Sequence, residues 1–133
     1  MTQYLLDTDT VSQLIRGHNA KLMAKAKGLK AQQAALSVVS RGELAFGISL
    51  KPMSAAFMHN FEAVLSALPV LPLPEEAAQH YGDIRSHLRQ LGQPIGPNDL
   101  WIAAHARALG YTLISHNLRE MARVPKLRVE SWL

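Results

Sequence analysis

The sequence predicts an α/β fold, with a parallel β-sheet flanked by helices. Short apolar runs typical of buried strands alternate with segments of helical periodicity along all 133 residues. Strands that alternate with helices in this way form a parallel sheet covered on both faces. No repeat, low-complexity tract or linker interrupts the chain, so we expect residues 1–133 to form a single domain.

The amino-terminal half supplies the first two strands. Residues 4–6 and 35–39 are apolar runs too short for helices, and we expect both to be buried strands. Gly17 and Gly28 are natural stops for two short helices. Helices are expected over residues 10–16, 19–27, 40–50 and 55–68.

The carboxy-terminal half continues the alternation. Residues 70–73 lie between prolines and are either a short strand or an extended connector. Pro74 suits the first turn of a helix and Gly92 suits its end. Helices are expected over residues 74–91, 98–109 and 118–123, and strands over 112–115 and 127–129.

Composition excludes several classes of site. The chain has no cysteine, which rules out disulfides and thiolate-bound zinc or iron–sulfur clusters. No signal peptide is visible and no apolar run approaches transmembrane length, so we expect a cytoplasmic protein with no membrane partner. A formal charge of +4 is weak evidence for a polyanionic partner, because solvated lysines are common on helix faces.

Three acidic residues stand where strands run into helices: Asp7, Glu43 and Asp99. The carboxyl ends of parallel strands meet at one edge of the sheet, and ligands bind there where the strand order switches. Clustered carboxylates repel one another unless a cation lies between them. Oxygen ligands without sulfur favour Mg²⁺, or Mn²⁺ in its place.

Each of these acids also has a purely structural interpretation. Asp7 precedes a helix and is a candidate cap. Ser40 and Glu43 match the capping box S-x-x-E, in which the glutamate reaches back to the cap residue. Asp99 lies in a first helical turn, where a negative charge is favourable, although Asn98 suffices as the cap.

Further polar residues follow the strand expected at 112–115. Asn117 and Glu120 reach the same edge of the sheet, and Glu120 is equally compatible with an exposed ion pair to a neighbouring arginine. The six histidines show no zinc-binding spacing. We expect His105, on an alanine-rich helix, at the edge of the core or on the surface, and His116 in a plain loop.

Four segments together resemble a known family. They are LLDTD at 5–9, SRGELAFG at 40–47, PIGPNDLWIAAHARALG at 94–110 and TLISHNLREMARVPKLRVESWL at 112–133. In these segments the chain resembles VapC-type toxins, the PIN-domain ribonucleases of bacterial toxin–antitoxin pairs. The resemblance covers nearly the whole chain, and the third segment is its most specific part.

The resemblance implies a PIN fold and Mg²⁺-dependent RNA cleavage. It assigns catalytic roles to Asp7, Glu43 and Asp99, with Asp7 and Asp99 as metal ligands. The fourth acidic position is open: Asn117 occupies a neutral version of it, and Glu120 is the remaining acid. Substrate contacts are expected from Thr8, Ser115 and Asn117.

The same resemblance implies partners. These are a cognate VapB-type antitoxin, a second copy of the chain in a homodimer, and a structured RNA, with initiator tRNA cut in its anticodon loop. DNA would be bound only through the antitoxin. Arg16, Arg41, Arg119 and Arg123 are candidates for holding the RNA backbone.

Two other functions remain open from the sequence. DTDTV at 7–11 matches the D-x-D opening of haloacid-dehalogenase-type phosphatases, in which Asp7 would be the nucleophile and Asp9 the acid/base. The second alternative is a non-catalytic module that binds RNA or protein with the same fold. Substitution of Asp9 separates the two enzymes, and metal binding separates either enzyme from a pure binding module.

Overall fold

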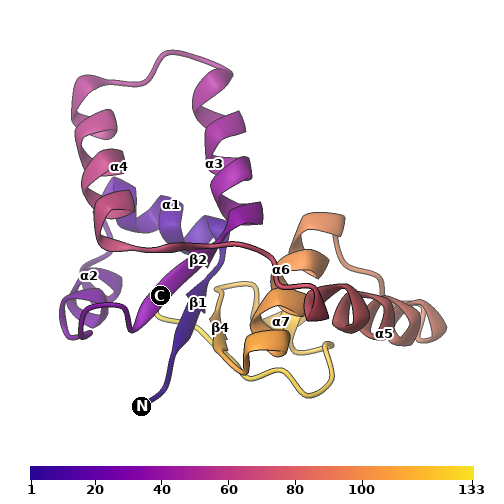
Figure 1. The fold of residues 1–133 in the computed structure, drawn as a ribbon. Helices are drawn as coiled ribbons and strands as arrows, with labels where there is room; N and C mark the ends of the chain where they lie inside the picture. The colour runs from indigo at the N-terminus through magenta and orange to yellow at the C-terminus, as the bar shows by residue number, and fades with distance from the viewer.

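The computed structural model describes residues 1–133 as strands and helices in alternation (Figure 1). The strands are β1 (Tyr4–Leu6), β2 (Ala34–Ser37), β3 (Val70–Leu71), β4 (Thr112–Ile114) and β5 (Val129–Glu130). The helices are α1 (Thr8–Arg16), α2 (Ala20–Lys27), α3 (Val38–Ser49), α4 (Ala55–Ala67), α5 (Glu76–Gln90), α6 (Pro97–Leu109) and α7 (Leu118–Met121). The predicted α/β class is confirmed.

The strands form one five-stranded sheet in the order β3-β2-β1-β4-β5, and every pairing is parallel. The central strand β1 pairs with β2 on one side and β4 on the other, with Leu5 opposite Ala35 and Leu113. After β1, the chain adds β2 and then β3 on one side of it. The chain then crosses to the other side of β1, where β4 and β5 are added. The strand order therefore switches at the carboxyl end of β1, which is where Asp7 lies.

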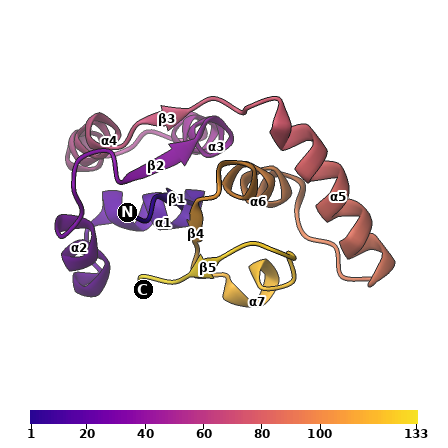
Figure 2. The ribbon, with the colours of Figure 1, turned by 60° about the horizontal axis from the view of Figure 1, so that its bottom comes forward.

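The two faces of the sheet bury separate cores. Leu5 and Leu113 pack with apolar residues of α5 and α6 on one face. Leu6 and Leu36 pack on the other face with residues of α1, α2, α3 and α4. Successive residues of a strand point to opposite faces, so Leu5 and Leu6 enter different cores although they are neighbours. Figure 2 shows α2 and α5 on opposite sides of the molecule.

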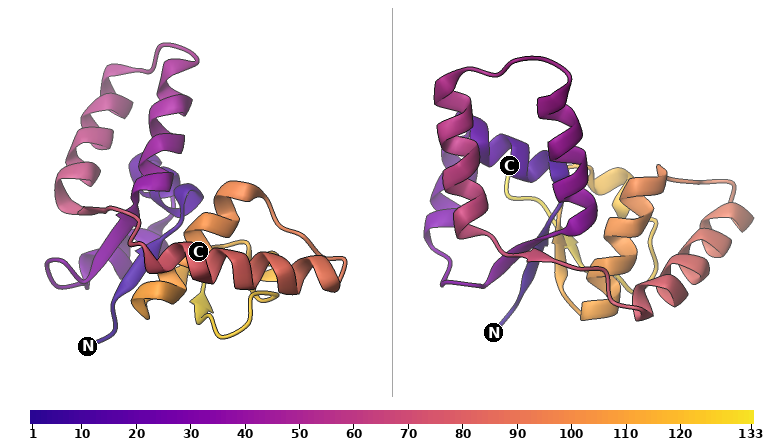
Figure 3. Two further views of the ribbon diagram at one scale, coloured as in Figure 1. Left: turned by 45° about the vertical axis from the view of Figure 1, so that its right-hand side comes forward. Right: turned by 45° about the horizontal axis from the view of Figure 1, so that its top comes forward.

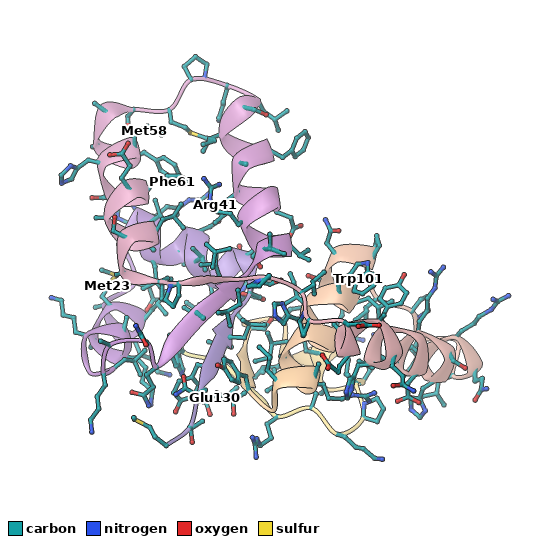
Figure 4. All side chains as sticks on the ribbon, viewed as in Figure 1. Met23, Arg41, Met58, Phe61, Trp101 and Glu130 are labelled. Atoms are coloured by element: carbon teal, nitrogen blue, oxygen red, sulfur yellow. The ribbon has the colours of Figure 1, made fainter.

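Two parts of the fold project from the sheet. The hairpin of α3 and α4 extends beyond its carboxyl edge, and α5 reaches outward before a loop returns to α6 (Figure 3). The cation of Arg41 lies 5.5 Å from the ring centroid of Phe61 and links the two helices of the hairpin (Figure 4). No helix is both long and apolar enough to span a bilayer.

Several local predictions are wrong at their boundaries. The strand expected to end at residue 39 ends at Ser37, and α3 begins at Val38. Ser37, not Ser40, caps α3 by accepting from the N–H of Val39 (3.1 Å). The proposed capping box of Ser40 and Glu43 is therefore absent, and Ser40 is buried instead.

The start of α6 differs in a similar way. Asn98 does not cap it; the cap residue is Gly96, which makes no side-chain cap, and Pro97 takes the first helical position. Residues 70–73, left open between a strand and a connector, contribute the short edge strand β3. β3 pairs only with β2, and very short edge strands limit the unpaired edge that a sheet exposes.

Candidate functional site

A cavity of about 340 Å³ lies at the switch point of the sheet. Its lining brings together three of the predicted acids from three elements: Asp7 after β1, Glu43 on α3 and Asp99 on α6. Thr8 and Asn117, two of the predicted substrate contacts, line it as well. Ser115 and Glu120 do not.

Asp7 both caps α1 and faces this cavity. Its Oδ1 accepts a hydrogen bond from the N–H of Thr10 (2.9 Å), as expected for an N-cap. The residue is 5% exposed, so it is a buried carboxylate with one oxygen engaged by the helix. Its second oxygen makes no protein hydrogen bond of its own. Asp7 is therefore a helix cap that also lines the cavity, and its catalytic role stays a prediction.

Glu43 lies one and a half turns into α3, half-buried, and points back toward the end of β1. Its Oε1 accepts a short hydrogen bond from the hydroxyl of Thr8 (2.5 Å). This contact fixes the Glu43 side chain against the first turn of α1. Thr8 therefore positions an acid of the cavity, whereas the sequence did not identify Glu43 as its partner.

Asp99 carries the electrostatic signature of the site. Burial raises the pKa of Asp99, and the negative charges of Glu43, Asp7 and Glu120 raise it further. These carboxylates are thus close enough to disfavour the ionisation of Asp99. A cation bound among them would remove this repulsion, because it favours the charged form of each neighbour.

The remaining predicted residues have different surroundings. Glu120 is half-buried and forms no ion pair with Arg119 or Arg123, so the expected surface pair is absent. Ser115 is fully buried, and its hydroxyl accepts from the N–H of Asn117 (3.0 Å), which shapes the turn after β4. That contact holds Asn117 at the rim of the cavity.

His116 lies at this rim rather than in a plain loop. Its Nδ1 is 2.6 Å from Oδ2 of Asp9, and both side chains are about half exposed. The pair joins the turn after β4 to the first turn of α1. Both residues line the cavity, and neither role was visible in a sequence where they stand more than a hundred residues apart.

A buried polar group braces the two helices that carry Glu43 and Asp99. His105 of α6 is fully buried, which corrects the expected edge or surface position, and its Nδ1 lies 2.8 Å from the hydroxyl of Ser37. Burial lowers the pKa of His105 and keeps it neutral. Its Nε2 and the hydroxyl of Ser40 are buried without a partner in the protein, a pattern typical of sites for ordered water.

The donor set fits a hard cation held by few protein atoms. The side chains that line the cavity carry carboxylate, hydroxyl and amide oxygens, together with the imidazole of His116 and the thioether of Met121. No three acidic or histidine side chains converge on a single point. Mg²⁺ is commonly held by one or two carboxylates together with waters, and this arrangement meets that need without a complete protein cage.

Comparison with known proteins identifies the family. The family model described as PIN domain matches residues 4–127 of this chain. The chain belongs to the PIN domain family. The resemblance noted in the sequence is confirmed, and the alternative of a haloacid-dehalogenase-type phosphatase is excluded by the family of the fold.

The relatives of this PIN domain are VapC ribonucleases. It is 35% identical over 133 residues to "Ribonuclease VapC2" of Haemophilus influenzae (strain ATCC 51907 / DSM 11121 / KW20 / Rd), with 100% of both chains covered. It is 32% identical over 132 residues to "tRNA(fMet)-specific endonuclease VapC" of Salmonella typhimurium, with 99% of each covered. Among solved structures, it superposes on VapBC2 from Rickettsia felis, bound to a promoter DNA fragment, with a TM-score of 0.90, 30% identity, and coverage of 99% and 100%.

Proposed function

We propose that this PIN domain is the Mg²⁺-dependent endoribonuclease toxin of a toxin–antitoxin pair. The observation that carries the proposal is the cavity lined by Asp7, Glu43 and Asp99, where burial and the neighbouring negative charges raise the pKa of Asp99. Carboxylates held this close together destabilise the fold through repulsion unless they bind a cation. The names of the relatives, which are ribonucleases over the full chain length, point to RNA as the substrate.

Asp7 and Asp99 are the proposed direct ligands, with Glu43 as a further ligand or as support through water. When bound, Mg²⁺ supplies an acidified water and offsets charge on the phosphoryl oxygens. Thr8 fixes Glu43 through its hydroxyl, and Asp7 is fixed by the first turn of α1. Asn117, at the rim, is placed to contact the phosphodiester. Mn²⁺ meets the same donor set.

The proposed substrate is a structured RNA, specifically initiator tRNA cut in its anticodon loop. The Salmonella typhimurium relative is named a tRNA(fMet)-specific endonuclease and matches over nearly its whole length. A loop exposes unpaired nucleotides whose backbone can bend into a narrow cavity, whereas a duplex cannot. Because the proposed substrate is tRNA, the proposed location of the activity is the cytoplasm.

The test is cleavage of purified tRNA with Mg²⁺ by the unmodified protein and by D7N. Asparagine caps a helix as well as aspartate does, so D7N keeps α1 intact and removes only the charge. We expect the rate to fall by more than about a hundredfold, and EDTA to abolish cleavage. D83N, which removes a charge from the exposed surface of α5, is the matched control and should cleave normally.

Equal cleavage by D7N, or activity that survives EDTA, would refute the metal site. Binding of RNA with no cleavage and no uptake of Mg²⁺ in calorimetry would favour the non-catalytic alternative. D9N should retain nuclease activity, because Asp9 pairs with His116 at the rim instead of facing Asp99.

The same proposal includes a VapB-type antitoxin as partner. A solved relative is a VapBC complex. An apolar groove of about 870 Å³ between α2 and α4 can bind an antitoxin segment, with Met23, Val64 and Trp132 in its lining; Met23 is labelled in Figure 4. DNA would then be bound by the antitoxin. Co-purification of the two chains tests this binding site, and replacement of Val64 by Asp should abolish the co-purification.

A homodimer is also proposed. Phe46 and Leu50 project from the end of α3 and are 65% and 67% exposed, which is costly for large apolar side chains unless another surface covers them. Light scattering of the unmodified protein and of F46S should show a dimer and a monomer, respectively. A monomer in both would exclude the dimer.

A further inference from the structure

A groove on α5 lies outside the chemistry described so far. It has a volume of about 480 Å³ and runs between α5 and the loop that returns to α6. Tyr81, Arg85 and Arg89 form its α5 side, and Pro94, Ile95 and Pro97 form the loop side. We call it the α5 groove. A second hollow on the outer surface of α5 shares Arg85 and Arg89 with it.

The positive charge of the α5 groove is not neutralised. Arg85 and Arg89 are exposed and neither pairs with an acid. The nearest acid on the same helix, Asp83, is engaged by Arg107 at 2.6 Å. No acidic residue lines the groove. It therefore attracts anions, in contrast to the acidic cavity.

Aromatic rings stand beside these charges. Tyr81 stacks on Trp101 with ring centroids 4.0 Å apart and planes 22° apart (Figure 4 labels Trp101). The guanidinium of Arg85 lies 5.8 Å from the Tyr81 ring centroid and donates to its hydroxyl (2.9 Å). The stack anchors α5 on α6, and it holds Arg85 in place at the mouth of the groove before any ligand arrives.

The α5 groove and the acidic cavity share one turn of helix. Pro97 and Leu100 line the groove, whereas Asp99, between them, lines the cavity. Adjacent residues of a helix rise by about 1.5 Å each, so the two sites flank the same first turn of α6. A linear ligand in the cavity would therefore have to pass only this turn to reach the groove.

We propose that the α5 groove binds a single-stranded stretch of the RNA substrate beside the phosphodiester that is cut. This inference rests on the proposed ribonuclease function. Sites for single-stranded RNA combine a positive groove for phosphates with apolar and aromatic surface for bases. This enzyme needs such a positive surface, because its acid-lined cavity repels the RNA backbone that must enter it. Arg85 and Arg89 supply the attraction on one side.

The test compares RNA binding by proteins with and without R85Q/R89Q, both carrying D7N so that little RNA is cut during the measurement. Binding of a tRNA and of a single-stranded oligoribonucleotide is measured by fluorescence anisotropy between 50 and 200 mM salt. Loss of two phosphate contacts should weaken binding at least about tenfold per arginine and reduce the slope of log K against log salt by about 1.4.

Two matched variants distinguish an effect of the α5 groove on RNA affinity from an effect of net charge or of misfolding. K25Q/K27Q removes two charges from α2, on the opposite side of the sheet, and should leave affinity nearly unchanged. R85K/R89K keeps the charge and should keep the salt slope. In the active protein, R85Q/R89Q should raise KM and leave kcat unchanged, since Asp7 and Asp99 are untouched.

Three outcomes would overturn the inference while leaving the proposed function standing. They are normal RNA affinity in R85Q/R89Q, an equal loss in K25Q/K27Q, and a change in oligomeric state by light scattering without any change in RNA binding. The last result would assign the groove to a second copy of the chain. If the unmodified protein neither binds nor cuts RNA, the ribonuclease function itself fails.

Discussion

Replacement of Ser37 by alanine should destabilise the protein more than the loss of an ordinary helix cap. The Ser37 hydroxyl accepts from the N–H of Val39 (3.1 Å) and lies 2.8 Å from Nδ1 of His105. Loss of a cap costs about 1 kcal/mol. Leaving a buried imidazole nitrogen unpaired costs about 1–3 kcal/mol more. We expect S37A to lower the free energy of unfolding by about 2–4 kcal/mol.

The chain provides a matched control in Ser54. This serine caps α4 by accepting from the N–H of Phe57 (3.0 Å), but its surroundings are exposed and no second side chain depends on it. S54A should therefore cost only about 1 kcal/mol. Urea unfolding followed by circular dichroism measures both variants. Equal losses in S37A and S54A would refute a stabilising role for the His105 contact.

The same measurement bears on the site, because α3 carries Glu43 and α6 carries Asp99. If Ser37 and His105 brace the two helices, their substitutions should not be additive. A double-mutant cycle with H105L should give a coupling energy of about 0.5–3 kcal/mol. A coupling near zero would mean that the helices hold their relative positions without this pair.

Other predictions concern charge and backbone. The pKa of Asp99 is raised in the folded state, so its ionisation lowers stability as pH rises; D99N should raise the Tm at pH 7 in EDTA, an advantage that disappears in acid. Arg107 lowers the pKa of Asp83, so the Tm difference between the unmodified protein and D83N should vanish as pH falls through that pKa. Gly110 ends α6 at a φ of +71°, so G110A should cost about 1 kcal/mol, whereas G47A, in open space on α3, should gain about 0.5–1 kcal/mol in urea unfolding.

The fold was predictable because its strands are short apolar runs bounded by clear turn residues. Apart from Thr112, β1 and β4 contain no polar residue that would allow a different periodicity. The acids that follow the strands mark the carboxyl edge of the sheet. The switch point then follows from strand order. This reasoning correctly gathered Asp7, Glu43 and Asp99, which are separated by up to 92 residues, around one cavity.

What the sequence could not predict depends on packing between distant elements. Ser37 and Ser40 both fit a cap in the segment SVVS, and the choice falls to Ser37 because only it meets His105 of α6. Nothing in the alanine-rich segment around His105 reveals that an imidazole is fully buried there. The contacts of Thr8 with Glu43 and of Asp9 with His116 also join separate elements, and no local pattern encodes them.

The placement of β1 has a consequence for how the protein is made. Asp7, which directly follows β1, is translated almost at once. The strand β4, which pairs with the other side of β1, comes only at Thr112–Ile114, and Asp99 comes shortly before it. Domains fold as units, and a ribosome adds only about 5–20 residues per second. The carboxylate cavity of a nascent chain is therefore incomplete until nearly all of the chain has been synthesised, so the site cannot act before the fold is almost finished.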